Sequence, residues 1–563
     1  MQRRDRVRVL GICVLLATGV LAGPARAQHH NEHDERALAE DPRLAEGQIA
    51  PVLEGLGDWT HPVTTSSDRA QQFFDQGLAL TYGFNHQEAL RAFKEAARLD
   101  PDCAMAYWGW ALALGPNINL PMSPDVVPQA WEAMQMALER ADGVSPAERD
   151  YIEALATRYT DDPDADRAPL DAAYVEAMRK LHEKYPDDVD AATLYAAAIM
   201  NARPWDYWTR DGRPRGSTAT LLAVLEGAMA AEPHHLGANH YYIHAIEPVD
   251  PARAETAADN LRGRAPGAGH LVHMPSHIYI QVGRYADAFE VNRLAVEADA
   301  GYITQCRAQG IYPLNYYPHN MHFKAWAAMM EGRAAEALEA ARAVNAAVPP
   351  DHHGNDWALY QTFLSMPLFV MTRFGMWDAV LAEPAPPENA DYWTGIWRYA
   401  RALAYASTGD LKRARQEAKA LEKVRKSAKD TLIGFTTAGT LLEIASEVVA
   451  GEIDGAAGKH ADAIAHLDRA VRLEDGLSYT EPPDWYYSVR HDLGAALLEA
   501  GRPGEAEVVY WQDLRRFPDN GFALYGLAQS LEAQGRDEEA AAVRARYEAS
   551  WKHADRPLTS SRF

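Results

Sequence analysis

The sequence feature that most constrains the fold is a short motif that recurs along the chain, a glycine turn followed by an alanine-rich helical segment. Ala506 in GRPGEA and Ala540 in GRDEEA are 34 residues apart. Further copies are GRYADAF, GRAAEAL, GDLKRAR and KHADAIAHL, which begin at residues 283, 332, 409 and 459. A period of this length accommodates one pair of helices, so the sequence predicts an all-α array of stacked helix pairs.

The first complete unit carries the motif in its clearest form. In FFDQGLALTYGFNHQEALRAFKEAARLDPDCAMAYWGWALALG, Gly77 and Leu80 belong to the first helix, Ala89 and Phe93 to the second, and Pro101 closes the unit. This pattern resembles the tetratricopeptide repeat (TPR) superfamily. The resemblance implies a solenoid, a superhelix of helix pairs whose first helices line a concave groove.

Several other runs in the chain also belong together. AMAYWGWALALGPNIN, NARPWDYWTRDGRP, HLGANHYYIHAIE, GHLVHMPSHIYIQVGRY and YPHNMHF together resemble a family of exported bacterial TPR proteins with a histidine-rich central region. This resemblance implies no activity and no role for any single residue.

The amino-terminal residues predict export. They combine a basic start, a short apolar run and an Ala-Arg-Ala cleavage site, which is the pattern of a secretory signal peptide over residues 1–27. The protein is then expected to be periplasmic or secreted, with no membrane span after the signal is removed. Residues 28–66 are expected to form a polar leader. N-terminal helical repeats follow at 67–230, with ordered loops at 116–128 and 205–215, then a histidine-rich central region at 231–350 and C-terminal helical repeats at 351–563.

Charge and motif content exclude several classes of function. The formal net charge is −24 at pH 7, and loss of the predicted signal would make it −28, so binding to nucleic acid is not expected. The sequence has no H-E-x-x-H, G-x-S-x-G, Walker or dinucleotide-binding motif.

Histidine is concentrated in the central region. Nine of the 21 histidines lie within residues 234–322. Eight candidate metal ligands fall in three rows with helical spacing. The rows are His240, His244 and Glu247; His270, His273 and His277; and His319 and His322.

The repeat register relates these rows to one another. His270 and His319 are 49 residues apart, as are His273 and His322, and this distance equals one repeat plus a tyrosine-rich insertion at 301–318. We therefore expect three consecutive first helices to direct histidines into one groove. The histidines expected to converge are His240, His244, His273, His277, His319 and His322, with Glu247 and His270 at the edge.

Two classes of function remain open. Imidazole is a suitable ligand for zinc, copper and iron. The eight candidates exceed the ligands that one metal ion needs, so either two ions bind or some of the histidines contact the ligands or a substrate instead of the metal. Glu247 could be a ligand or a general base for a metal-bound water, which would make the protein a metalloenzyme. The alternative is a scaffold without metal that binds a peptide or protein partner in the groove.

Overall fold

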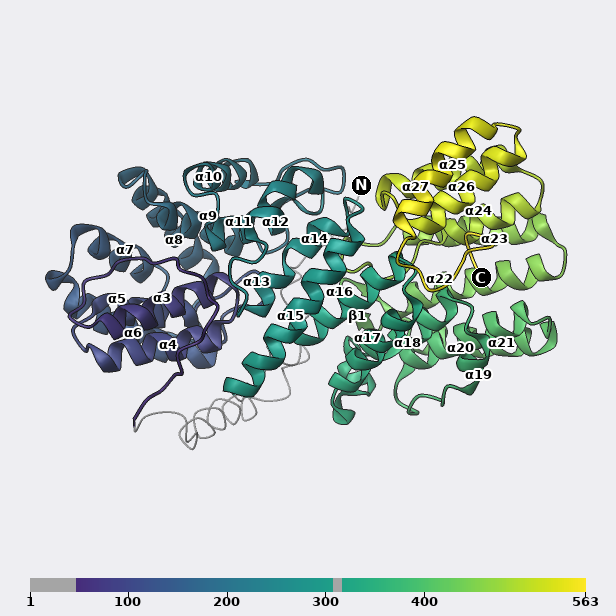
Figure 1. Ribbon diagram of the computed structural model, residues 1–563. Coiled ribbons are helices and arrows are strands. Elements are labelled where there is room, and N and C mark those ends of the chain that lie inside the picture. Colours follow the sequence, from purple (N-terminus) through teal and green to yellow (C-terminus); the bar gives the residue numbers. More distant parts are fainter. Residues whose placement is uncertain (1–46, 307–315) are drawn as a thin grey trace, which may run out of the picture. The chain divides into compact units, whose positions relative to one another are not determined.

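The protein is almost entirely helical in the computed structural model, which describes residues 47–306 and 316–563 (Figure 1). Within these ranges strand is confined to a hairpin of β1 (Leu432–Ile433) and β2 (Thr436–Thr437). The prediction of an all-α fold of stacked helix pairs is therefore confirmed. The predicted signal peptide, the leader up to residue 46 and part of the tyrosine-rich insertion lie outside the described residues.

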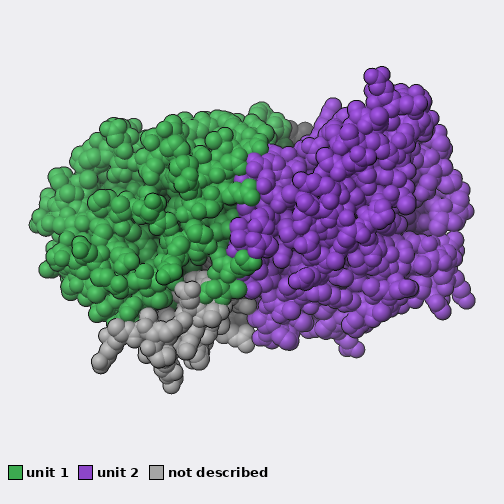
Figure 2. All heavy atoms as spheres, in the orientation of Figure 1, with its two compact units in different colours: residues 1–275, 297–312 green, residues 276–296, 313–563 purple. Residues whose placement is uncertain are grey.

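The chain divides into two compact units (Figure 2). Residues 1–275 and 297–312 form unit 1, and residues 276–296 and 313–563 form unit 2. The division after Pro275 falls inside the segment 231–350, which the sequence predicts to be one central histidine-rich region. In the described part of the chain, no helix combines the length and the apolar character that a membrane crossing requires.

The helices of the first part of the chain, up to the division, are α3 (Asp68–Tyr82), α4 (His86–Leu99), α5 (Ala104–Leu114), α6 (Val127–Arg140), α7 (Pro146–Ala156), α8 (Arg167–Lys184), α9 (Val189–Ala202), α10 (Thr218–Ala231), α11 (Leu236–Ile246), α12 (Glu255–Leu261) and α13 (Gly269–His273). The later helices are α14 (Pro275–Tyr279), α15 (Tyr285–Cys306), α16 (Tyr317–Met330), α17 (Ala334–Ala347), α18 (Tyr360–Arg373), α19 (Trp377–Ala382), α20 (Asp391–Ser407), α21 (Leu411–Ser427), α22 (Ala438–Ala456), α23 (His460–Glu474), α24 (Arg490–Glu499), α25 (Pro503–Arg516), α26 (Gly521–Ala533) and α27 (Asp537–Ser550).

Aromatic side chains of second helices fill the space between consecutive first helices. Phe93 of α4 is fully buried, and a Cβ added to Gly77 of α3 or Gly109 of α5 would lie 2.7 or 2.3 Å from its ring. In the C-terminal repeats, Tyr510 of α25 meets Gly494 of α24 in the same way, at 2.3 Å. Only glycine lets the two helices approach this closely. The small residues of the repeat pattern are therefore required by packing.

Replacing one of these glycines should loosen the stack. In Gly109→Ala the added methyl group meets the buried ring of Phe93, so we expect the free energy of unfolding to fall by roughly 1–3 kcal/mol, measured by urea unfolding. Gly227→Ala in α10 is the matched control, because no atom lies within 4 Å of the Cβ added there. That variant should be neutral or stabilised by up to about 1 kcal/mol. Equal destabilisation of both variants would contradict the packing argument.

The turns within the helix pairs share one backbone feature. In the turn between α16 and α17, Gly332 has a φ of +74°, a value that L side chains rarely adopt. The same left-handed glycine occurs in the other turns of this type in unit 2, at Gly283, Gly375, Gly409, Gly458, Gly501 and Gly535. The recurring glycine of the sequence motif is thus explained by this turn.

The second half of the predicted polar leader is ordered. Residues 48–66, here called the N-terminal strap, run along unit 1 and bond to it repeatedly. The amide of Ile49 donates to Glu95 at 2.9 Å, that of Thr64 donates to Glu148 at 2.6 Å, and Gly55 accepts from the amide of Gly267 at 2.7 Å. The strap is therefore part of unit 1, and this stretch of the predicted polar leader packs on the helical repeats.

A buried carboxylate holds the strap at its centre. Asp190 of α9 accepts from His61 of the strap at 2.7 Å, from His235 at 3.0 Å and from the hydroxyl of Tyr82. Burial opposes ionisation of Asp190, but the hydrogen bonds from His235 and His61 outweigh it and hold the pKa of this carboxyl below its usual range. Burial also lowers the pKa of His61, yet the hydrogen bond and charge of Asp190 outweigh it and raise this pKa above its usual value.

This ion pair should make the stability of unit 1 depend on pH. Because the pKa of His61 is raised on folding, its contribution is complete below about pH 6.5, the usual histidine value, and is lost as pH rises through the folded pKa. His61→Gln should therefore lower the free energy of unfolding more at pH 6 than at pH 9, as measured by urea unfolding. His553→Gln, at an exposed position, is the control. A pH-independent effect of His61→Gln would refute the ion pair.

Candidate metal centre

Helix α11 positions two of the predicted ligands. It begins at Leu236, where the side chain of His235 accepts a hydrogen bond from the amide of Ala238 and caps the helix. Every residue of α11 is buried. His240 and His244 are one turn apart on the same face, and their side chains are 0% and 2% exposed. Histidine therefore occupies positions that a buried helix normally gives to apolar residues.

A third imidazole comes from the short helix α13. The ring centroid of His270 lies 5.0 Å from that of His240 and 6.3 Å from that of His244. One ring nitrogen from each of these residues can be chosen so that all three lie within 4.8 Å of one another. His270 is 3% exposed. We refer to His240, His244 and His270 as the histidine triad.

Hydrogen bonds orient two rings of the triad. The Nδ1 of His240 lies 2.5 Å from the main-chain carbonyl oxygen of Tyr82 at the end of α3. A carbonyl only accepts, so this Nδ1 carries a proton, and in the neutral ring Nε2 keeps its lone pair. The Nδ1 of His244 faces the carboxylate of Glu247, the residue that follows α11, at 3.2 Å. Metal-binding histidines commonly have such a partner on the nitrogen that does not bind the metal.

The spacing of the triad is close to what a metal ion requires. Zn–N bonds of about 2.0–2.1 Å in a tetrahedral site place ligand nitrogens about 3.3 Å apart. The triad nitrogens, within 4.8 Å of one another, would reach that separation through small side-chain rotations. Neutral imidazoles held this way can bind a transition metal, and three protein ligands leave one position for water or a substrate atom.

Two strained aromatic residues form walls around the triad. The ring of Phe84 lies 4.5 Å from that of His240, 5.9 Å from that of His244 and 5.6 Å from that of His270. Trp205, from the predicted ordered loop at 205–215, packs edge-on against His244 at 5.3 Å. Phe84 has a φ of +57° and Trp205 a φ of +61°. In the described residues only Asp519 shares this conformation among non-glycine residues, and aspartate tolerates it better.

Phe84 occupies the position that is glycine in the other turns. In the α3–α4 turn, the amide of Phe84 donates to the carbonyl three residues earlier, and the amide of the next residue donates to the carbonyl five residues before it. The amide of Gly332 and that of its next residue form the same two hydrogen bonds in the α16–α17 turn, so Phe84 corresponds to Gly332. A non-glycine residue in the left-handed region costs of order 1–3 kcal/mol, and such residues cluster at functional sites. The position of Phe84 over three imidazoles supplies a reason for keeping it.

The strain at Phe84 can be measured with two substitutions. Phe84→Ala and Phe84→Gly both remove the buried ring, which should lower the free energy of unfolding by roughly 3–5 kcal/mol. Only Phe84→Gly also relieves the backbone, so it should be more stable than Phe84→Ala by about 1 kcal/mol in urea unfolding. This order reverses the usual preference for alanine over glycine. If Phe84→Ala is the more stable variant, the turn is not strained.

The remaining predicted ligands are not members of the triad. His273 ends α13, with its ring centroid 5.8 Å from that of His270. In unit 2, the rings of His277 and His319 lie 5.9 Å apart, and both pack against Phe323. His277 also forms an ion pair with Glu481. The expectation that histidines of all three rows form one centre stays a prediction.

His322 stands apart from the other histidines of unit 2. It packs against Phe363 and Tyr486, whereas His319, on the same helix, faces His277. Burial lowers the pKa of His322 to about 3, so its ring is neutral. Its Nε2 has no hydrogen-bond partner among the described residues. A role for His322 as a metal ligand together with His319 stays a prediction.

The structure also changes two expectations about the site. His270, expected at the edge, is a full member of the triad. The triad comes from α11 and α13 and is buried, with the Phe84 ring packed on it, so its side chains are not exposed along an open groove. The first helices α3 and α11 contact each other, which closes the space between them.

Comparisons with known proteins assign neither a family nor a function to this chain. No protein-family model matches the sequence, and no curated protein matches it. Similar solved structures include a human IFIT1 dimer with m7Gppp-AAAA, 12% identical with a TM-score of 0.30, covering 88% of this chain and 92% of that chain. Another is the APC/C hetero-tetramer Cut9–Hcn1, 12% identical with a TM-score of 0.28, covering 85% of this chain and 76% of that chain. The expectation that this chain does not bind nucleic acid still rests on its net charge.

Proposed function

We propose that unit 1 binds one transition-metal ion through the Nε2 atoms of His240 and His244 and one ring nitrogen of His270. The observation that carries the proposal is the convergence of three buried imidazoles, two of which are oriented through Nδ1 by Tyr82 and Glu247. Packing alone gives no reason for three histidines at these positions, since a buried helix face favours apolar side chains.

The charge of the site fits a divalent ion with an open coordination position. Three neutral imidazoles bring no charge. The carboxylate of Glu247, which is 1% exposed, would not bind the ion itself but faces the ligand His244. The remaining positive charge would favour ionisation of a bound water, which is the chemistry of zinc hydrolases. Glu247 is then a residue that orients His244. Zinc, copper and iron all accept such ligands.

Metal analysis of the purified, untagged full-length chain tests the proposal. We expect about one equivalent of zinc, copper or iron per chain, and near-complete loss in His244→Ala with helix content unchanged by circular dichroism. His322→Ala is the matched control, because that buried histidine packs against Phe363 and Tyr486 and is not a member of the triad, so this variant should keep the metal. Full occupancy in His244→Ala, or no metal in the wild-type protein, would disprove the triad as the site.

An absence of metal would favour the other class of function. TPR-like folds commonly act as scaffolds that bind peptide or protein partners along their stacked helices. In that case the triad would be a hydrogen-bonded network that stabilises the contact between α3 and α11, and His244→Ala would reduce stability without changing any metal content.

A further inference from the structure

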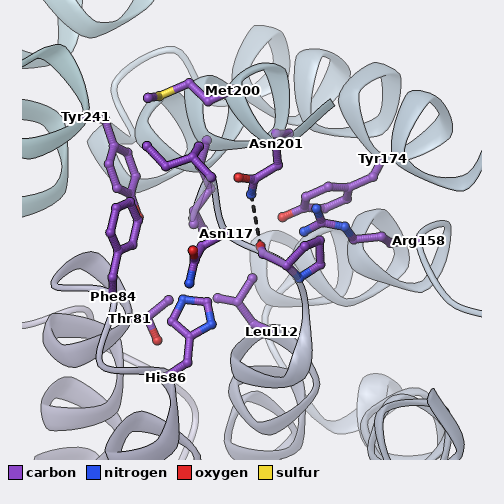
Figure 3. Close-up of a pocket in the computed structure, with 15 residues that line it drawn as sticks. Thr81, Phe84, His86, Leu112, Asn117, Arg158, Tyr174, Met200, Asn201 and Tyr241 are labelled. Carbon is purple, nitrogen blue, oxygen red and sulfur yellow. Dashed lines mark hydrogen bonds between the residues drawn. The ribbon is translucent and has the colours of Figure 1, made fainter. Parts of the chain in front are cut away.

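A small pocket lies in unit 1 (Figure 3), and one of its lining residues, Phe84, also packs on the histidine triad. Its walls come from the end of α3, the α3–α4 turn, the ordered loop after α5, the segment after α7, and helices α9 and α11. In Figure 3, Phe84 and Tyr241 form one side of the pocket, and Arg158 lies on the opposite side. The cavity is about 30 Å³ in volume, which is room for roughly two water molecules.

The charge around this pocket is positive. Arg158 is only 2% exposed, and its Nε donates to Asp171 at 2.9 Å. A second guanidinium, that of Arg167, lies 3.7 Å from the same carboxylate. Two positive groups thus share one negative group, which leaves an excess of one positive charge at this wall. No acidic side chain is among the described residues that line the pocket.

An asparagine of the ordered loop supplies a second fixed donor. The side-chain oxygen of Asn117 accepts from the amides of Asn119 at 2.8 Å and Leu120 at 2.9 Å. These bonds identify the oxygen, so the NH₂ group is on the other side, where Figure 3 shows it beside the ring of His86. Burial lowers the pKa of His86 to about 4, so this ring is neutral and adds no negative or positive charge.

We propose that this pocket binds a small carboxylate anion, of the size of formate or acetate. The carboxylate oxygens would accept from the guanidinium of Arg158 and the NH₂ group of Asn117, the kind of charge-assisted bonds that favour an anion in a buried site. Phe84, Leu112 and Tyr241 would pack against the rest of the molecule. A small anion would replace the water that a cavity of this size otherwise holds.

The pocket shares a wall with the triad, yet it does not depend on a metal. The ring of Phe84 lines the pocket and also packs on His240 at 4.5 Å. None of the three triad histidines lines the pocket. The anion site goes beyond the proposed metal site, and it can be tested on the metal-free protein.

The test uses ¹³C-labelled formate and the full-length, chelator-treated protein. We expect saturable broadening of the formate signal on addition of protein, competed by acetate and not by chloride at equal ionic strength. Formate should also raise the thermal unfolding midpoint relative to chloride. No saturable broadening, or broadening that chloride reverses equally well, would overturn the proposal.

Asn117→Asp assigns the binding to this pocket. The substitution keeps an oxygen for the two loop amides but replaces the NH₂ donor with a negatively charged oxygen, so formate should bind at least about tenfold more weakly. Asn119→Asp, the same change two residues along the loop and outside the pocket lining, should leave binding unchanged. Arg158→Lys, which keeps the charge beside Asp171, should also weaken binding, and it covers the case in which Asn117→Asp does not fold. Unchanged binding in the folded Asn117→Asp protein would move the anion site elsewhere.

Discussion

The hydrogen bond between His240 and the main-chain carbonyl of Tyr82 is the interaction on which the site in unit 1 depends. It joins two helices whose bonded residues are 158 positions apart in sequence, and it lies in a fully buried environment. It fixes the protonation of His240 and brings the end of α3 against α11. The next turn then places Phe84 over the triad and into the wall of the neighbouring pocket.

Strain and burial occur together around this hydrogen bond. A turn that elsewhere has glycine carries a phenylalanine, and the loop residue Trp205 adopts a similarly unfavourable backbone conformation against His244. Each aromatic contributes a large apolar surface to an interior that also holds three imidazoles and a carboxylate. Polar groups in such surroundings have strong interactions with one another because little water screens them. The unfavourable backbone conformations of Phe84 and Trp205 accompany the packing of their rings against the triad.

The sequence predicted the fold and part of the site. The 34-residue period and the glycine positions specify helix pairs, and Phe93 between Gly77 and Gly109 shows why the pattern exists. The spacing of His240 and His244 predicted a shared helix face, which is correct because both lie within one regular helix.

Other features depend on contacts that a sequence does not show. The strap looks like a polar leader because its partners, such as Glu95 and Asp190, are remote carboxylates. The break between α13 and α14 interrupts the continuous helical spacing expected for His270, His273 and His277. When the copies of the turn motif are aligned in the sequence, Phe84 stands where the other copies have glycine, and this difference could have indicated the site.

The contact between α3 and α11 also has a consequence for how the chain folds. In a simple repeat array each unit touches only its neighbours, so folding can start at any unit and propagate. In unit 1 the first helix pair is completed by residues far along the chain, since Tyr82 requires His240, and Gly55 of the strap requires Gly267. Such long-range contacts slow folding and couple distant units. Unit 1 should therefore form as a single cooperative block, and a chain truncated before α11 would lack the packing partner of its own first helix.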